Sequence, residues 1–161
     1  MTQDSRQTCV EVKLQTRFRG FTIIWVKKII KKMMAMKQKQ GFGVSVLLTD
    51  DREIRKINKR FLNHNYATDV IAFGLDEEPL LGDIVVSVER ARAVAKELGI
   101  PFKEELARYL VHGMLHLLGY EDKPKKKYDR MHKRQEKILD VILRRSRRIS
   151  KRDPSSLRSS G

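Results

Sequence analysis

The stretch Val111–Asp122, which reads VHGMLHLLGYED, constrains the fold of this chain more than any other. His112 and His116 stand four residues apart in an apolar run, so on a helix their side chains share one face, one turn apart. Gly119 predicts the end of that helix and allows a sharp turn that returns Asp122 toward the histidines. Two imidazole nitrogens and one carboxylate oxygen can hold zinc with a fourth position open. The stretch therefore predicts a metal-site helix.

The spacing of two histidines alone leaves an alternative, because histidines also occur buried in helical cores. Gly113 favours the metal site, since glycine inside a helix costs about 1 kcal/mol relative to alanine and indicates that a side chain would obstruct something. Gly113 also stands where the zinc-protease motif H-E-x-x-H places its glutamate general base. Peptide hydrolysis is therefore disfavoured. A zinc ion that acidifies water and polarises an oxygen also suits a phosphodiester.

The net charge of +15 is unevenly distributed along the chain. Three segments carry most of it, namely Lys27–Lys39, Lys123–Arg134 and Arg144–Arg158. Clustered positive charge of this size indicates a polyanionic partner, most often nucleic acid. The alternative is a lysine-rich surface that serves solubility or heat stability.

Length and composition narrow the class of protein further. The 161 residues suffice for one domain. No apolar run is long enough to predict a membrane span, and the polar N-terminus predicts no export signal. The single cysteine, Cys9, excludes an internal disulfide and a four-cysteine zinc site, and it fits a reducing cytoplasm.

Hydrophobic periodicity predicts four strands and five helices. The strands are expected at 10–14, 44–49, 68–73 and 81–88, and the last is expected to be central because its apolar run is continuous. An amphipathic, basic helix is expected from Phe21 to Met34, and a second helix over Asp50–Asn63 has Ile54, Ile57 and Phe61 as its apolar stripe. Three further helices are expected over Val88–Leu98 with Ser87 as the cap, from Pro101 through the histidines, and over about Tyr128–Arg145. Strands come early and three helices come late, which favours a single α+β domain over residues 1–146. Arg147–Gly161 has almost nothing to bury and is predicted to be a disordered basic tail.

Three blocks of the sequence resemble a known family. HGMLHLLGYED at 112–122 is similar to the H-G-x-L-H-L-x-G-Y-D-H signature of the YbeY family, which comprises bacterial rRNA maturation factors and single-strand endoribonucleases. TDVIAF at 68–73 and LGDIVVS at 81–87 are similar to that family's P-T-D-V-L-S-F and L-G-D-I-x-I-S segments. The blocks occur in the family's order and spacing, and the resemblance covers roughly Val10–Leu143.

The resemblance implies a fold, an activity and partners. The expected fold is a mixed four-stranded sheet packed with helices, with a zincin-like metal-site helix. The expected activity is zinc-dependent endonucleolytic cleavage of single-stranded RNA in the cytoplasm, without a membrane or DNA partner. Its substrate would be ribosomal RNA, in maturation of the 3′ end of the small-subunit rRNA and in ribosome quality control.

Residue by residue, His112 and His116 match the family outright, and two positions depart from it. Asp122 replaces the third histidine and Glu121 replaces the aspartate before it. A carboxylate can coordinate zinc, but its negative charge makes the ion less electrophilic. A divalent metal other than zinc is therefore an alternative. Leu62 stands where many members carry an arginine that meets RNA phosphate, so Asn63, His64 or nearby lysines are candidate substitutes.

The leading hypothesis is that His112, His116 and Asp122 hold one zinc ion and that a water or a substrate 2′-hydroxyl attacks phosphorus. Glu121 is the nearest carboxylate to take a proton, or else a solvated turn residue. His132, which lysines surround, is predicted to be a surface residue. Two other hypotheses stay open: an rRNA-binding assembly factor that does not cut, and a zinc hydrolase with a substrate other than nucleic acid.

Overall fold

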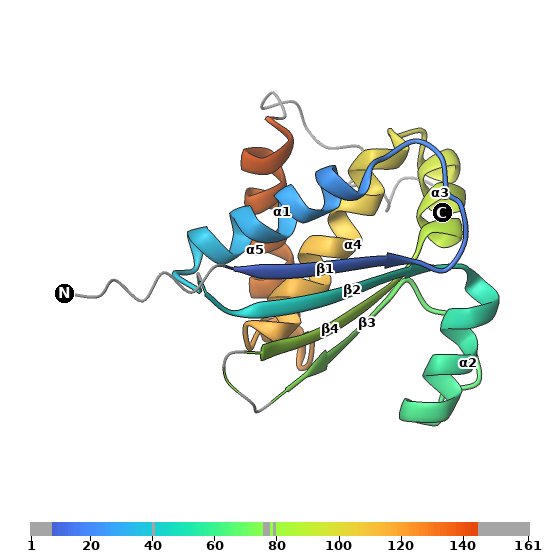
Figure 1. Ribbon diagram of the computed structural model, residues 1–161, viewed down its shortest axis with the longest axis horizontal. Helices are drawn as coiled ribbons and strands as arrows, with labels where there is room; N and C mark the ends of the chain where they lie inside the picture. The colour runs from blue at the N-terminus through green and yellow to red at the C-terminus, as the bar shows by residue number, and fades with distance from the viewer. Residues whose placement is uncertain (1–7, 40, 76–77, 79, 145–161) are drawn as a thin grey trace.

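A four-stranded mixed sheet forms the framework of the computed structural model, which describes residues 8–39, 41–75, 78 and 80–144 (Figure 1). The strands are β1 (Cys9–Leu14), β2 (Gly43–Thr49), β3 (Val70–Gly74) and β4 (Leu80–Ser87), in the spatial order β1-β2-β4-β3. β1 pairs with β2 and β2 pairs with β4 in parallel, whereas β3 pairs with β4 antiparallel. The expected α+β class and mixed sheet are confirmed, and β4 is central as predicted.

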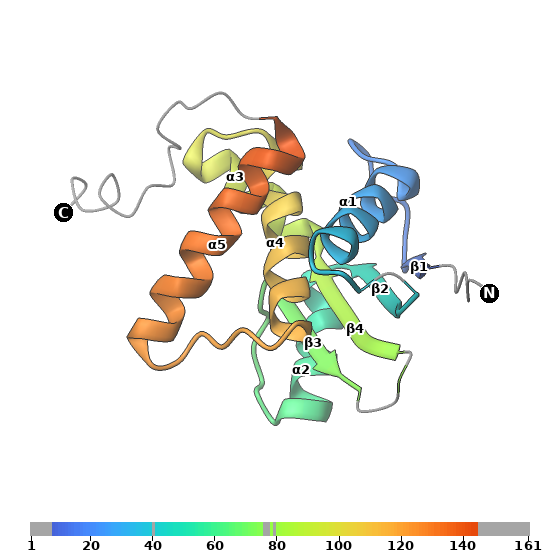
Figure 2. The same ribbon diagram turned by 90° about the vertical axis from the view of Figure 1, so that its left-hand side faces the viewer.

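Five helices complete the described part of the chain: α1 (Ile23–Met36), α2 (Asp51–Leu62), α3 (Val88–Leu98), α4 (Phe102–Leu117) and α5 (Lys125–Leu143). α1, α3, α4 and α5 gather on one side of the sheet, and α2 lies apart from them (Figures 1 and 2). None of the helices that the structure describes is long and apolar enough to cross a membrane.

The main core fills the space between the sheet and the larger group of helices. Val46 and Ile84 from the sheet, Met34 from α1 and Leu110 and Met114 from α4 are all fully buried there. A smaller cluster joins Ile54 of α2 to Ile71 and Val85 on the other face of the sheet. α4 is therefore buried along most of its length, which holds its histidines on a rigid element.

Local chemistry explains most helix boundaries. Asp50 and Ser87 cap α2 and α3, since their side-chain oxygens accept from the backbone N–H of Glu53 and Arg90 at 2.8 and 3.1 Å. Gly99 ends α3 in the left-handed conformation. These expectations are confirmed.

Two expectations on helices need correction. Phe61 does not complete a buried stripe on α2: its side chain is 60% exposed, and Asn58 is buried in its place. α5 begins at Lys125, three residues before the expected start at Tyr128. Hydrophobic periodicity missed these three residues because all of them are lysines. The predicted tail at 147–161 and the domain boundary at 146 lie outside the described residues.

Candidate metal centre

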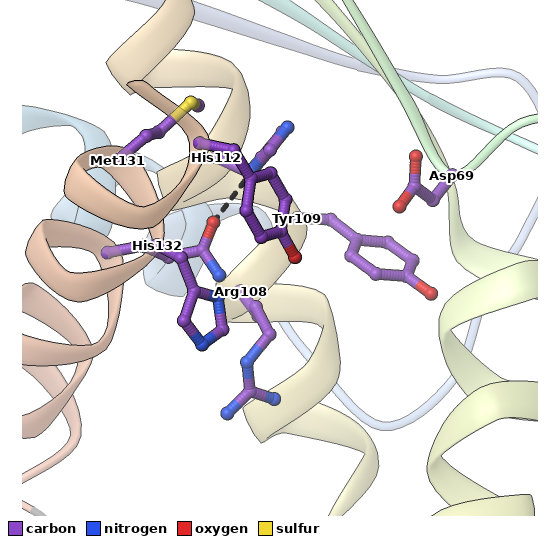
Figure 3. A pocket seen from close by; sticks show the side chains of 8 residues that line it. Asp69, Arg108, Tyr109, His112, Met131 and His132 are labelled. Carbon is purple, nitrogen blue, oxygen red and sulfur yellow. Dashed lines mark hydrogen bonds between the residues drawn. The ribbon is translucent and has the colours of Figure 1, made fainter. Parts of the chain in front are cut away.

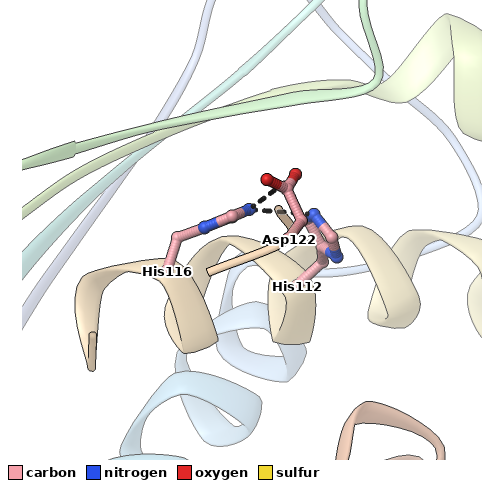
Figure 4. A group of neighbouring side chains, drawn as sticks. All are labelled: His112, His116 and Asp122. Carbon is pink, nitrogen blue, oxygen red and sulfur yellow. Dashed lines mark hydrogen bonds and ion pairs between the residues drawn. The ribbon is translucent and has the colours of Figure 1, made fainter. Parts of the chain in front are cut away.

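His112 and His116 project from α4 toward Asp122, which follows the turn that ends the helix (Figure 4). The two Nε2 atoms lie 3.1 Å apart, and His116 Nε2 lies 3.6 Å from Asp122 Oδ2. One ligand atom from each of the three residues lies within 4.8 Å of the other two. Gly119, at φ +97°, makes the turn that brings the carboxylate back, as the sequence predicts.

Each imidazole is held by an acceptor on its other ring nitrogen. His112 Nδ1 lies 2.8 Å from Gln135 Oε1, and His116 Nδ1 lies 3.1 Å from the carbonyl oxygen of Tyr120. A carbonyl oxygen can only accept, so both Nδ1 atoms carry the proton and, in neutral rings, both Nε2 atoms present lone pairs. This arrangement is typical of metal-bound histidines.

The close approach of the two Nε2 atoms is the observation that fits a metal to this site. With both protons on Nδ1, two nitrogens 3.1 Å apart repel one another, and a cation that both of them bind removes the repulsion. Two nitrogens about 2.0–2.1 Å from a tetrahedral zinc ion lie roughly 3.3 Å apart, which is close to the observed spacing. The donor set therefore fits a divalent ion that accepts nitrogen and oxygen ligands.

The electrostatic surroundings keep His116 in its neutral form. Burial and the neighbouring His112 lower the pKa of the His116 imidazole, against the opposing effects of Asp122, the Tyr120 carbonyl and Asp69. Because the pKa lies below the ordinary value near 6.5, His116 is mainly neutral at pH 7 and available as a ligand.

A buried ion network positions α5 against α4 beneath the histidines. Arg108 is 3% exposed and donates through Nε and Nη2 to both carboxylate oxygens of Glu136, at 3.1 and 2.9 Å. It also donates to Glu105 at 2.8 Å. Burial opposes the charge of Arg108, but the hydrogen bond to Glu136 and the nearby carboxylates outweigh it and raise its pKa. Because Glu136 is next to Gln135 in α5, this network also positions the Gln135 side chain, whose Oε1 accepts from His112 Nδ1.

Gly113 packs against the sheet. A Cβ atom there would come within 2.8 Å of Ile84 Cγ2 and 3.1 Å of Val70 Cγ2. The expectation that a side chain would obstruct something is thus confirmed, but the obstruction is to close packing of α4 on β3 and β4. Gly113 supports the metal site indirectly, because it brings the helix down onto the strand that follows Asp69.

Two cavities meet at the histidines. The His112-side cavity, of about 190 Å³, lies between α4, α5 and the start of β3, with Asp69 opposite Arg108 and His112 (Figure 3). The His116-side cavity, of about 490 Å³, lies between α4, β3 and the segment after α2. Leu62 and His64 line the second cavity, so the position of the missing family arginine does face this site.

Sequence reasoning placed some of these residues and missed others. Glu121 lines the His116-side cavity and pairs with Lys127, outside the group of three ligand atoms. His132, predicted to be a surface residue, is half-buried and lines the His112-side cavity. Gln135 had no local signal, since a spacing of 23 residues separates it from the histidine that it contacts. Asp69 lies in the TDVIAF block, but nothing in the sequence indicated that it lines this site.

Comparison with known proteins gives consistent results. The family model described as Endoribonuclease YbeY matches residues 11–142. A protein named Endoribonuclease YbeY from Persephonella marina is 36% identical over 131 residues, which cover 78% of this chain and 79% of that protein. A protein of the same name from a Sulfurihydrogenibium species is 33% identical over 148 residues, which cover 88% of this chain and 97% of that protein.

A solved structure shares the fold. The solution structure of a Thermotoga maritima protein superposes with a TM-score of 0.60 at 28% sequence identity, and the match covers 83% of this chain and 88% of that one.

Proposed function

The chain belongs to the YbeY family of endoribonucleases, and on this premise we propose that it cleaves single-stranded ribosomal RNA with a zinc ion held by His112, His116 and Asp122. Family membership makes it an RNA-cleaving, metal-dependent hydrolase with a role in rRNA processing. The finer proposal is that it matures the 3′ end of the small-subunit rRNA and acts in ribosome quality control. Its catalytic domain would span residues 1–146.

The observation that carries the proposal is the close approach of two Nε2 atoms beside a carboxylate, in rings whose Nδ1 atoms each face an acceptor oxygen. A zinc ion bound there would acidify water and neutralise charge that develops on phosphorus oxygens. Gln135 and the Tyr120 carbonyl hold the two rings in the orientation that such binding requires. Glu121, whose side chain is 60% exposed, lines the His116-side cavity and pairs with Lys127; it would be the carboxylate that accepts a proton from the attacking oxygen.

The test of this function uses one RNA sequence in two forms. The purified protein is expected to cut the single strand at internal positions and to leave the same sequence in a duplex intact. A chelator should stop the cleavage, and added zinc should restore it. Tight RNA binding without any cleavage would favour the assembly-factor hypothesis, and zinc binding with neither binding nor cleavage of RNA would favour another substrate class.

Replacing Gln135 with methionine is expected to weaken zinc binding about 10- to 100-fold, because His112 loses the acceptor that fixes its proton on Nδ1. Methionine has a similar volume and suits this buried position. The measurement is a competition titration of zinc against a chelator of known affinity. Lys137→Met, on an exposed position of α5, is the matched control and should bind zinc like the unchanged protein. Equal affinities in all three proteins would contradict the role of Gln135.

Asp122→Ala is expected to weaken zinc binding by more than about tenfold, since it removes one of three ligand atoms. Asp122→His should restore binding and raise the cleavage rate, because a neutral imidazole leaves more positive charge on the ion than a carboxylate does. Asp129→Ala removes an exposed aspartate from α5 and serves as the control. If Asp122→Ala and Asp129→Ala retain zinc equally well, Asp122 is not a ligand.

A further inference from the structure

We propose that the two cavities beside the histidines are nucleobase subsites for the nucleotides on either side of the cleaved bond, each with a stacked Tyr–His pair as its platform. The inference rests on the proposed function and assigns the substrate contacts of that site. The pairs are His64 with Tyr66 and Tyr128 with His132.

The geometry places one pair on each side of the metal centre. His64 and Tyr66 line the His116-side cavity, and Tyr128 and His132 line the His112-side cavity. The two histidines that separate these cavities have Nε2 atoms only 3.1 Å apart. A nucleotide chain with one base in each cavity would therefore pass beside the metal centre.

The ring geometry suits stacking on a base. The His64 and Tyr66 rings are 12° from parallel with centroids 5.4 Å apart, and those of Tyr128 and His132 are 10° from parallel at 5.9 Å. Tyr66 is 56% exposed and Tyr128 is 47% exposed, so about half of each residue's surface is accessible to a base. Exposed ring faces of this kind bind the bases of single strands without regard to sequence.

The His64–Tyr66 platform is held in place by α2. Asn63 turns the chain in the left-handed conformation, and the backbone N–H of His64 then donates to the Asn58 carbonyl at 3.2 Å. The buried Asn58 side chain donates through Nδ2 to the Tyr66 carbonyl at 3.0 Å. The platform is thus ordered before any RNA binds, which reduces the entropic cost of stacking.

Charge separates the sites for bases from those for phosphates. Asp69 lines one cavity and Glu121, which pairs with Lys127, lines the other, so both offer carboxylate acceptors to the N–H groups of bases. Arg108, which also lines the first cavity, is already paired with Glu105 and Glu136. Basic side chains lie outside, on the exposed surface of the two helices next to the platforms: Arg52, Arg55, Lys56, Lys59 and Arg60 on α2, and Lys125, Lys126, Arg130 and Lys133 on α5. Bases would enter the cavities while the backbone follows the basic rims. A duplex hides its bases in the helical stack, so this arrangement selects single strands.

The experiment combines protein variants with base-lacking substrates. Single abasic nucleotides are introduced on either side of the mapped cleavage site of a fluorescent oligoribonucleotide, and kcat/KM is measured. Each abasic substitution should lower kcat/KM of the unchanged protein at least about fivefold. Tyr66→Ala and Tyr128→Ala should each lower it similarly on the intact RNA. For each alanine variant, the abasic nucleotide on one side of the cleavage site should no longer lower kcat/KM, while the one on the other side still does. The side that no longer matters should differ between Tyr66→Ala and Tyr128→Ala.

The controls separate stacking from folding and from the proposed function. Tyr66→Phe and Tyr128→Phe keep the ring and should retain the sensitivity to the abasic positions that the alanine variants lose. Phe61→Ala removes an equally exposed aromatic that lines a different cavity and should have no effect. Fluorescence anisotropy of the intact oligonucleotide with metal-free protein should show the same losses of affinity.

Full cleavage by both alanine variants, or unchanged sensitivity to abasic nucleotides, would overturn the inference and leave the proposed function standing. If the unchanged protein neither binds nor cuts RNA, the proposed function and the inference fail together.

Discussion

Replacing His116 with alanine is expected to abolish zinc binding and RNA cleavage while the fold persists. The side chain would supply one of the two proposed nitrogen ligands, so zinc affinity should fall by more than the roughly 10- to 100-fold that loss of a supporting residue causes. The side chain is 29% exposed, and its other ring nitrogen contacts only the turn after α4, so the core is untouched. His112→Ala should behave in the same way.

Both variants are tested by elemental analysis for zinc per chain and by an assay of single-stranded RNA cleavage. Circular dichroism verifies that they are folded. His132→Ala is the control for zinc content, because it removes a histidine from the adjoining cavity that is not among the three ligands, and it should keep one ion per chain. Undiminished cleavage by both purified variants, His112→Ala and His116→Ala, would contradict the assignment.

Replacing Gly82 with alanine is expected to destabilise the protein by about 3 kcal/mol or more. Gly82 has φ +151°, and a Cβ atom there would lie 2.1 Å from the carbonyl oxygen of Phe73 and 2.8 Å from Leu117 Cδ2. The clash with a backbone atom inside the β3–β4 pair can be relieved only by moving a strand, which adds to the strain of the backbone conformation. Leu117 is next to His116, so zinc binding should weaken as well.

The chain supplies a matched control for this prediction. Gly74 pairs with Gly82 across the two strands, yet a Cβ atom on Gly74 would meet nothing within 4 Å. Gly74→Ala should therefore change the free energy of unfolding by less than about 1 kcal/mol. Urea unfolding curves with equal slopes give both values. If Gly82→Ala were as stable as Gly74→Ala, the close packing at the start of β4 would be refuted.

Periodicity was sufficient to predict most of the fold. The continuous apolar run of β4 and the caps at Asp50 and Ser87 are local signals that the structure confirms. The alternation in β1 is confirmed in part, because Val10 is buried and Leu14 is 36% exposed. Phe61 was misplaced because a helical stripe predicts burial only where something covers it. Ile54 and Ile57 of α2 pack on the sheet, whereas Phe61 touches it only through an edge-on contact with Phe73 of β3 and stays 60% exposed.

The candidate site divides in the same way between local and long-range signals. The histidine pair and the turn to Asp122 follow from spacing within eleven residues. The acceptors for the two rings do not, since one is a side chain on α5 and the other is a backbone carbonyl that every residue possesses. The cavities and their stacked rings also depend on how α5, α2 and β3 pack around α4, which no local pattern encodes.

The central claim is that one ion held by His112, His116 and Asp122 drives the cleavage of RNA. Its most direct test is a titration of zinc into metal-free protein, followed by the rate of cleavage of a single-stranded oligoribonucleotide. The rate should start near zero, rise in proportion to added zinc and level off at one equivalent per chain. Full cleavage by protein verified to be metal-free, or a rate that does not respond to zinc or another divalent ion, would contradict the claim.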